Sequence, residues 1–270
     1  MAIDHYENFP VASVLVPRAL RGPIHEIYRF ARCADDIADE GEDPPAERLA
    51  ALAALDADLV RIAAGTYPAG ARWSGLAAVV QAHGLPVELL RDLLRAFSQD
   101  VRGMVYRDYD DLRAYCRRSA NPIGRLLLAL YRRGEADLLA WSDAICTGLQ
   151  LVNFWQDVER DYAKGRVYVP LSEFERFGVE PGQIARRRAD AAWQRLLAAQ
   201  TAVARDLLLS GRPLAAALGG RIGWELRLVI QGGLRIAERI DAVGGDVFSR
   251  RPELRGADWA KMALRALAMP

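Results

Sequence analysis

The chain has 270 residues, of which 51% are apolar, and its formal net charge is +1. This length can bury one sizeable core, so we expect a single domain over residues 1–270. The near-neutral charge, with no basic run flanked by aromatic residues, argues against a nucleic-acid-binding protein. No apolar run approaches the roughly 20 residues of a membrane span, which argues against an integral membrane protein.

Cysteine usage and the first residues bear on the compartment. The cysteines Cys33, Cys116 and Cys146 form no Cys-x-x-Cys pair, and an odd number fits a reducing compartment. The start of the chain, MAIDHYENFP, is polar and unlike a signal peptide. We therefore expect a cytoplasmic protein, and reversible contact with a membrane surface stays open.

Apolar residues recur at spacings of three and four along nearly the whole chain, which predicts an all-α fold. Glycine and proline residues separate the helical stretches. The predicted helices cover residues 24–39, 47–64, 73–83, 86–102, 108–119, 123–133, 135–164, 172–177, 189–209 and 214–242. A short helix opens at Pro181, and residues 248–270 follow as a capping segment. The one good strand signal, RVYVP at residues 166–170, is short.

Glycines inside two of the predicted long helices need an explanation. Gly148 lies in the helix over residues 135–164, and Gly232 and Gly233 lie in the last long helix. Each costs about 1 kcal/mol relative to alanine in a helix. Gly148 indicates either close helix packing or room for a ligand. For the Gly232–Gly233 pair the alternatives are close packing and a pocket for ordered water.

The stretch over residues 151–168, LVNFWQDVERDYAKGRVY, carries the strongest chemical signal. Asn153, Asp157 and Asp161 are four residues apart, so their oxygens share one side of a helix. Oxygen ligands in such a row suit Mg²⁺. The cations that follow, which suit a diphosphate group, are Arg160, Lys164 and Arg166. The alternative is a solvated helix surface with alternating charges.

A second acidic cluster occurs far earlier in the chain. Asp35 and Asp39 share one helix face, with Asp36 about a quarter turn away. Tyr28 and Arg32 extend the same stripe. Carboxylates can hold metal ions that bridge phosphate oxygens, while an arginine binds the remaining oxygens. Alone, such a cluster is more often a surface feature.

Two such helices facing one another would clamp a diphosphate between Mg²⁺ ions. Neutralising the departing diphosphate would leave a carbocation. The rest of the cavity must then be apolar and largely dry, because water would quench the cation. We expect a central cavity with both acidic segments at its mouth.

Three segments of the chain resemble the squalene/phytoene synthase family of head-to-head prenyl transferases. The segments are YRFARCADDIADE at 28–40, YCRRSANPIGRLLLALY at 115–131 and LVNFWQDVERDYAKGRVYVP at 151–170. The resemblance covers nearly the whole chain. It implies one domain with the helical isoprenoid-synthase fold, in which both aspartate motifs bind Mg²⁺.

The resemblance also implies roles for residues. If the roles known in the family are carried over to this chain, Tyr28 and Arg32 contact the diphosphate. The implied metal ligands are Asp35, Asp39, Asn153, Asp157 and Asp161. We add Asp36 to the metal ligands, and the four aspartates of the two motifs with Tyr28 form the catalytic set. The assigned diphosphate-binding residues are Ser13, Arg18, Arg32, Asn153, Arg160, Lys164 and Arg166.

Within the family, the segments ENFPVASVLVP, ANPIGRLL and WELRLVIQGGLRIAERI are most similar to the bacterial hopanoid-pathway branch. There, presqualene diphosphate is converted to hydroxysqualene and water ends the reaction. Gly233 stands where relatives that make phytoene or dehydrosqualene carry a tyrosine, which would open space for water. The resemblance also implies functional coupling with other squalene-pathway enzymes and leaves peripheral membrane contact open.

Two alternatives to this function stay open. The first is a synthase that condenses two farnesyl or geranylgeranyl diphosphates to presqualene diphosphate, squalene or phytoene. No Gly-rich dinucleotide fingerprint is visible, but squalene synthases that reduce their cation also lack it. The second is a non-catalytic helical partner subunit, against which the intact aspartates argue.

Overall fold

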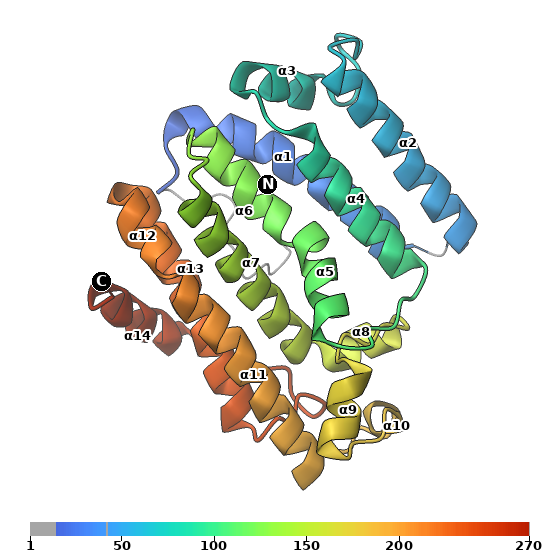
Figure 1. Ribbon diagram of the computed structural model, residues 1–270, viewed down its shortest axis with the longest axis vertical. Helices are drawn as coiled ribbons and strands as arrows, with labels where there is room; N and C mark the ends of the chain where they lie inside the picture. Colours follow the sequence, from blue (N-terminus) through green and yellow to red (C-terminus); the bar gives the residue numbers. More distant parts are fainter. Residues whose placement is uncertain (1–14, 42, 270) are drawn as a thin grey trace.

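The structure, a computed structural model, describes residues 15–41 and 43–269 and is all-α, as predicted (Figure 1). One isolated bridge between Val105 and Val167 replaces the predicted strand. The helices are α1 (Arg18–Asp39), α2 (Pro45–Ala63), α3 (Ser74–His83), α4 (Val87–Val101), α5 (Tyr109–Ser119), α6 (Asn121–Leu130), α7 (Ala136–Gln156), α8 (Val158–Ala163), α9 (Leu171–Phe177), α10 (Gly182–Ala185), α11 (Ala191–Gly211), α12 (Pro213–Leu218), α13 (Gly220–Ala242) and α14 (Gly256–Leu267).

Two predicted helices are each divided in two. The helix predicted over residues 135–164 breaks at Asp157, whose φ of −108° and ψ of 17° leave the α-helical region, and so becomes α7 and α8. The helix predicted over residues 214–242 breaks at Gly219, with φ 59° and ψ −169°. Only glycine adopts that conformation readily, so Gly219 separates α12 from α13.

The first helix starts earlier than predicted. α1 begins at Arg18, so Pro23 lies inside the helix rather than at its start. A proline removes the hydrogen bond to the carbonyl four residues before it. Here that carbonyl belongs to Ala19, in the exposed first turn, where water can replace the lost partner.

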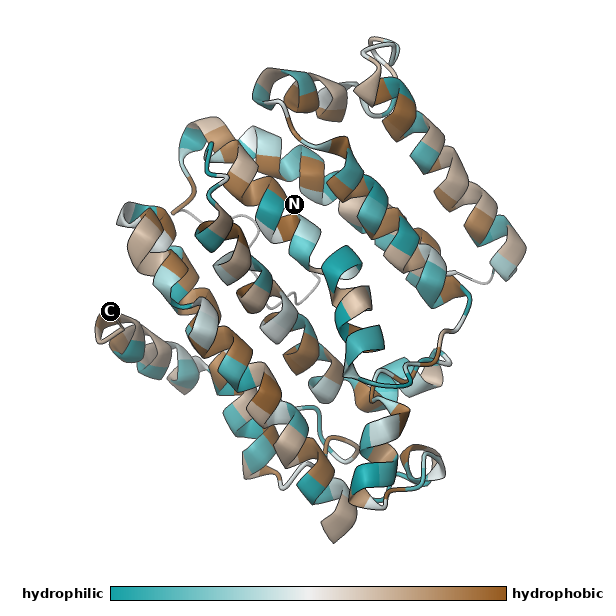
Figure 2. Ribbon diagram, in the orientation of Figure 1, coloured by the Kyte–Doolittle hydropathy of each residue, from teal (hydrophilic) through white to brown (hydrophobic). Residues whose placement is uncertain are grey.

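The buried side chains form two clusters. One is built from α1 to α4 with Leu126 and Leu130 of α6, and the other surrounds α7, α11 and α13. Helices α4 and α6 contribute to both, since Ala96 and Leu128 belong to the second cluster. Hydrophilic and hydrophobic residues alternate along most helices, as expected where one side packs inward (Figure 2).

Helix α7 lies in the middle of its cluster, and glycines allow its neighbours to come close (Figure 1). A Cβ built on Gly148 of α7 would lie 3.1 Å from the carbonyl oxygen of Ala204 in α11. A Cβ on Gly211 of α11 would lie 2.6 Å from the carbonyl oxygen of Trp141 in α7. Of the two alternatives for Gly148, close packing is therefore the correct one.

Of the two alternatives for Gly233, the structure favours close packing. A Cβ there would lie 2.9 Å from Leu149 Cδ2 and 2.9 Å from Leu208 Cδ1, so these two leucine side chains fill the space beside the glycine. Gly232 faces Met262 of α14, 3.5 Å from a built Cβ. The glycine pair thus brings α13 close to α7 and α11 on one side and to α14 on the other.

None of the helices in the described part of the chain is long and apolar enough to cross a membrane.

We predict opposite effects of alanine at two helical glycines. Gly148→Ala should lower the free energy of unfolding by about 1–3 kcal/mol, because its Cβ meets the backbone of α11. At Gly22 in α1, no atom lies within 4 Å of a new Cβ. Gly22→Ala should therefore raise the free energy of unfolding by up to about 1 kcal/mol. Urea unfolding of both variants measures this. Equal effects would contradict the role of Gly148 in packing.

Candidate active site

The two acidic segments meet where the end of α1 faces the turn after α8. Asp39 accepts hydrogen bonds from Lys164 Nζ at 2.8 Å and pairs with Arg166 Nη1 at 2.6 Å. Arg166 also donates to the backbone oxygen of Ala38 at 3.3 Å. Burial opposes the charged carboxylate, but the two cations outweigh it and lower the pKa of Asp39. Ion pairs therefore connect residues that are more than 120 positions apart in the sequence.

Arg32 holds the other acids of α1 together. It donates to Asp35 Oδ2 at 3.3 Å and to Glu40 Oε1 at 2.9 Å, and its Nη2 lies 2.7 Å from Asp36 Oδ1. Burial, and next the charge of nearby Asp39, raise the pKa of Asp35 to about 7. Arg32 thus neutralises only part of the negative charge at this end of α1.

Asp157, at the break between α7 and α8, is held from a distant loop. Arg251 Nε lies 2.5 Å from Asp157 Oδ1 and Nη2 lies 2.8 Å from Oδ2, a two-pronged contact. Arg160, predicted to bind diphosphate, approaches Oδ1 only to 3.8 Å and its side chain is largely exposed. The strongest counter-charge of Asp157 therefore comes from the loop between α13 and α14.

Asp161 has no described partner. Within residues 15–41 and 43–269, no side chain or backbone group donates to its carboxylate or forms an ion pair with it. Burial and the charge of Asp157 raise the pKa of Asp161 to about 8. The charges of Arg166 and Lys164 oppose this rise only in part, so the ionised carboxylate would gain from an added cation.

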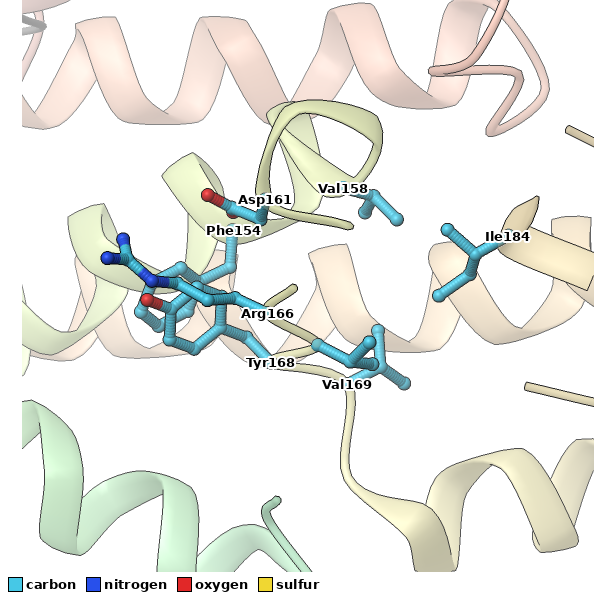
Figure 3. A pocket seen from close by; sticks show the side chains of 8 residues that line it. Phe154, Val158, Asp161, Arg166, Tyr168, Val169 and Ile184 are labelled. Atoms are coloured by element: carbon cyan, nitrogen blue, oxygen red, sulfur yellow. The ribbon is translucent and has the colours of Figure 1, made fainter. Parts of the chain in front are cut away.

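A small pocket lies beside Asp161. Asp161 and Arg166 form its polar end, and Val158, Val169 and Ile184 line the opposite end (Figure 3). The ring of Tyr168 stacks on that of Phe154 at a centroid distance of 3.7 Å. The cavity volume is about 10 Å³, roughly the room that one water needs. This pocket cannot hold a prenyl chain, and the central cavity stays a prediction.

Sequence reasoning missed a half-buried acid close to Arg166. Asp100, near the end of α4, accepts hydrogen bonds from the hydroxyls of Tyr115 at 2.6 Å and Tyr168 at 3.1 Å. Burial raises the pKa of Asp100 to about 6, although both hydroxyls and the charge of Arg166 oppose the rise. Its spacing resembles no ligand motif, and only its position near the YCRRSANP segment could have pointed to it.

Two arginines were also missed. Arg251 lies in a loop 94 residues beyond its partner Asp157, and no local pattern marks it. Arg48 of α2 donates to the backbone oxygens of Ala38 at 3.2 Å and Gly41 at 3.0 Å. It therefore caps the end of α1 beside Asp39, and a basic residue shortly after a helix end was the available signal.

The remaining assigned residues are spread more widely. Tyr28 is half-buried one turn before Arg32, and Asn153 is half-buried one turn before Asp157. Arg18 is not brought to the site, because it precedes Asp35 by 17 residues on the same helix, about 25 Å along the axis. Ser13 lies outside the described residues.

The donor set fits Mg²⁺ only with help from a ligand. In the described part of the chain, no three acidic, histidine or cysteine side chains are close enough to hold a metal ion. Mg²⁺, however, usually binds one or two carboxylates together with waters and substrate phosphates. The half-buried acids with raised pKa, Asp35 and Asp161, are the groups that such an ion would stabilise.

We predict that neutralising two of these aspartates changes stability in opposite directions. Without metal at neutral pH, Asp161→Asn should raise the free energy of unfolding by at least about 1 kcal/mol, because the Asp161 carboxyl must take up a proton on folding and the neutral amide need not. Asp39→Asn should lower it by about 1–3 kcal/mol, because Arg166 loses its carboxylate. Urea unfolding of both variants tests this, and destabilisation by Asp161→Asn would show that its charge is compensated.

Comparisons with known proteins identify the family of the chain. The family model for squalene/phytoene synthase matches residues 3–258. The chain is 32% identical over 264 residues to the hydroxysqualene synthase of Rhodopseudomonas palustris, covering 97% of this chain and 88% of that protein. The corresponding protein of Zymomonas mobilis is 33% identical over 227 residues, covering 83% of this chain and 75% of that protein.

Solved structures give the same result. The squalene synthase HpnC of Alicyclobacillus acidocaldarius matches with a TM-score of 0.82 and 38% identity, over 89% of this chain and 90% of that chain. A dehydrosqualene synthase crystallised with a ligand matches in fold with a TM-score of 0.83 at 20% identity, over 94% of this chain and 88% of that chain. The chain belongs to the squalene/phytoene synthase family and is an enzyme of that type.

Proposed function

We propose that residues 1–270 form one domain that ionises presqualene diphosphate and directs water onto the resulting cation, giving hydroxysqualene and diphosphate. The observation that carries this proposal is the meeting of the acidic end of α1 with Lys164 and Arg166, next to Asp157 and Asp161. The similarity to hydroxysqualene synthases over most of the chain supports the choice of substrate.

The cations of the site would bind the leaving diphosphate. Arg32, Lys164 and Arg166 now contact carboxylates, and a diphosphate would offer them further oxygens. Arg166 suits this role best, because only 10% of its side chain is exposed and its charge is poorly screened. A guanidinium also matches two phosphate oxygens at once.

Metal binding belongs to the same proposal. Asp35, Asp39, Asp157 and Asp161 would hold Mg²⁺ with Asn153, and Asp36 lies at the edge of the group with 42% of its side chain exposed. When bound, Mg²⁺ supplies Lewis-acid stabilisation of the diphosphate oxygens. Arg251 would then share Asp157 or turn its guanidinium toward the diphosphate.

The reaction balances with water alone. The carbon–oxygen bond to the diphosphate breaks and its electron pair leaves with the diphosphate. The oxygen of a water molecule then bonds to the carbocation and loses one proton. No reductant is consumed, in contrast to a squalene synthase that delivers hydride. The water-binding position is not at Gly233, where Leu149 and Leu208 fill the space.

The test is incubation with presqualene diphosphate and Mg²⁺ in ¹⁸O-water, with and without NADPH, followed by mass spectrometry. We expect hydroxysqualene carrying one labelled oxygen in both cases. Product formation from farnesyl diphosphate alone would favour the condensing synthase. No product from either substrate would favour a partner subunit, and an unlabelled alcohol would exclude capture of water.

The metal role makes a separate prediction. Asp35→Ala and Asp157→Ala should each lower kcat by orders of magnitude while the protein stays folded. Asp206→Ala, an exposed aspartate on α11, is the matched control and should leave kcat unchanged. Activity is measured before and after chelation of divalent ions. Near-normal turnover of both variants, or activity that survives chelation, would remove the metal from the mechanism.

Contact with a membrane surface and coupling to the enzymes that supply presqualene diphosphate are also part of the proposal. Substrate and product each carry a long hydrocarbon chain that dissolves poorly in water. A site that exchanges such molecules with a lipid phase needs no aqueous transfer of the free alcohol.

A further inference from the structure

The C-terminal helix α14 exposes an apolar side that the fold leaves uncovered. Trp259, Leu264 and Leu267 are 52%, 68% and 68% exposed, although large apolar side chains favour burial. Met262 and Ala266 on the opposite side are buried against α13. Figure 1 shows α14 at the edge of the bundle, with its outer side away from α13.

This exposed side is apolar throughout. At 3.6 residues per turn, the exposed positions cover roughly half of the helix circumference. No charged or polar side chain falls in that half, which we name the α14 face. Its members are Ala257, Trp259, Ala260, Ala263, Leu264, Leu267 and Ala268. A continuous apolar strip of this kind marks an interaction surface rather than scattered exposed residues.

Positive charge borders the α14 face. Lys261 and Arg265 lie at its edge with 43% and 40% of their side chains exposed. Both pair with Glu238, which also binds Arg235, so one carboxylate serves three cations. Residues 248–270 contain five basic and two acidic residues, a net charge of +3 in a chain whose total is +1.

We propose that the α14 face docks onto the surface of a lipid bilayer that contains anionic headgroups. A helix with leucine and tryptophan on one side and lysine and arginine beside them lies in the interface of such a bilayer. The aromatic ring of Trp259 suits the headgroup level, and the cations gain from the negative surface potential. A second copy fits less well, because a two-fold contact would bring the same cations of both chains together.

The α14 helix is fixed firmly enough to present this face. Asp258 pairs with Arg235 Nε at 2.6 Å and with Arg239 Nη2 at 2.6 Å. These contacts bind the start of α14 to α13 and use none of the exposed residues. Substitutions on the α14 face should therefore leave the fold intact.

The test is co-sedimentation of the full chain with vesicles of phosphatidylcholine, with or without phosphatidylglycerol. We expect binding to vesicles with phosphatidylglycerol that weakens with added salt. The double variant Leu264→Gln/Leu267→Gln should lower the partition coefficient about tenfold or more. Val60→Gln on α2, where Val60 is 50% exposed, is the matched control and should bind like the wild type.

Three outcomes would overturn the assignment. They are no binding by the wild type, equal binding by the double variant, and a dimer in analytical ultracentrifugation that the double variant dissociates. Turnover of presqualene diphosphate dispersed in detergent separates this result from the proposed function. Vesicle binding without turnover would reject only the reaction. Turnover without vesicle binding would reject the docking face and membrane contact, and would leave the reaction standing.

Discussion

The ion pairs of Asp39 with Lys164 and Arg166 are the contacts on which the site depends. They join α1, in the first hydrophobic cluster, to the turn after α8, in the second. Arg166 is nearly buried, so a missing partner would leave a poorly solvated charge. The same contact brings two acidic segments into range of one another. The same ion pairs thus stabilise the contact between α1 and the turn after α8 and bring the site residues together.

That arrangement leaves the charge at the site unbalanced. Asp39 and Asp157 each have a cation, whereas Asp161 has no described partner and Asp35 shares Arg32 with two other acids. Burial makes the unbalanced carboxylates costly, which their raised pKa expresses. Native structures tolerate such costs where binding later relieves them. These two poorly neutralised carboxyl groups are therefore the feature that favours a cationic ligand here.

The sequence predicted the all-α fold and most helices, because apolar spacing and glycine or proline breaks are local signals. It also singled out two acidic segments, since rows of oxygen ligands at helical spacing are local too, and the structure brings these segments together through Asp39, Lys164 and Arg166. The break at Asp157 was not predictable, because the local pattern continues through it and Arg251 lies 94 residues away. The choice between the two alternatives for Gly233 could not be made from the sequence for a related reason. A glycine in a helix indicates that a side chain would not fit there. Only the structure shows that Leu149 and Leu208 occupy the space beside it.

The loop that carries Arg251 connects the candidate active site to the proposed docking face. Arg251 forms an ion pair with Asp157. Five residues later α14 begins, and Asp258 of α14 pairs with Arg235 of α13. A helix resting on a bilayer would therefore restrain the loop that supplies a counter-charge to the site. Because the segment between Arg251 and α14 is short and is held at both ends, membrane contact would also affect how firmly Arg251 pairs with Asp157. The proposed docking face and the arginine that pairs with Asp157 therefore belong to one connected stretch of the chain, between α13 and the end of α14.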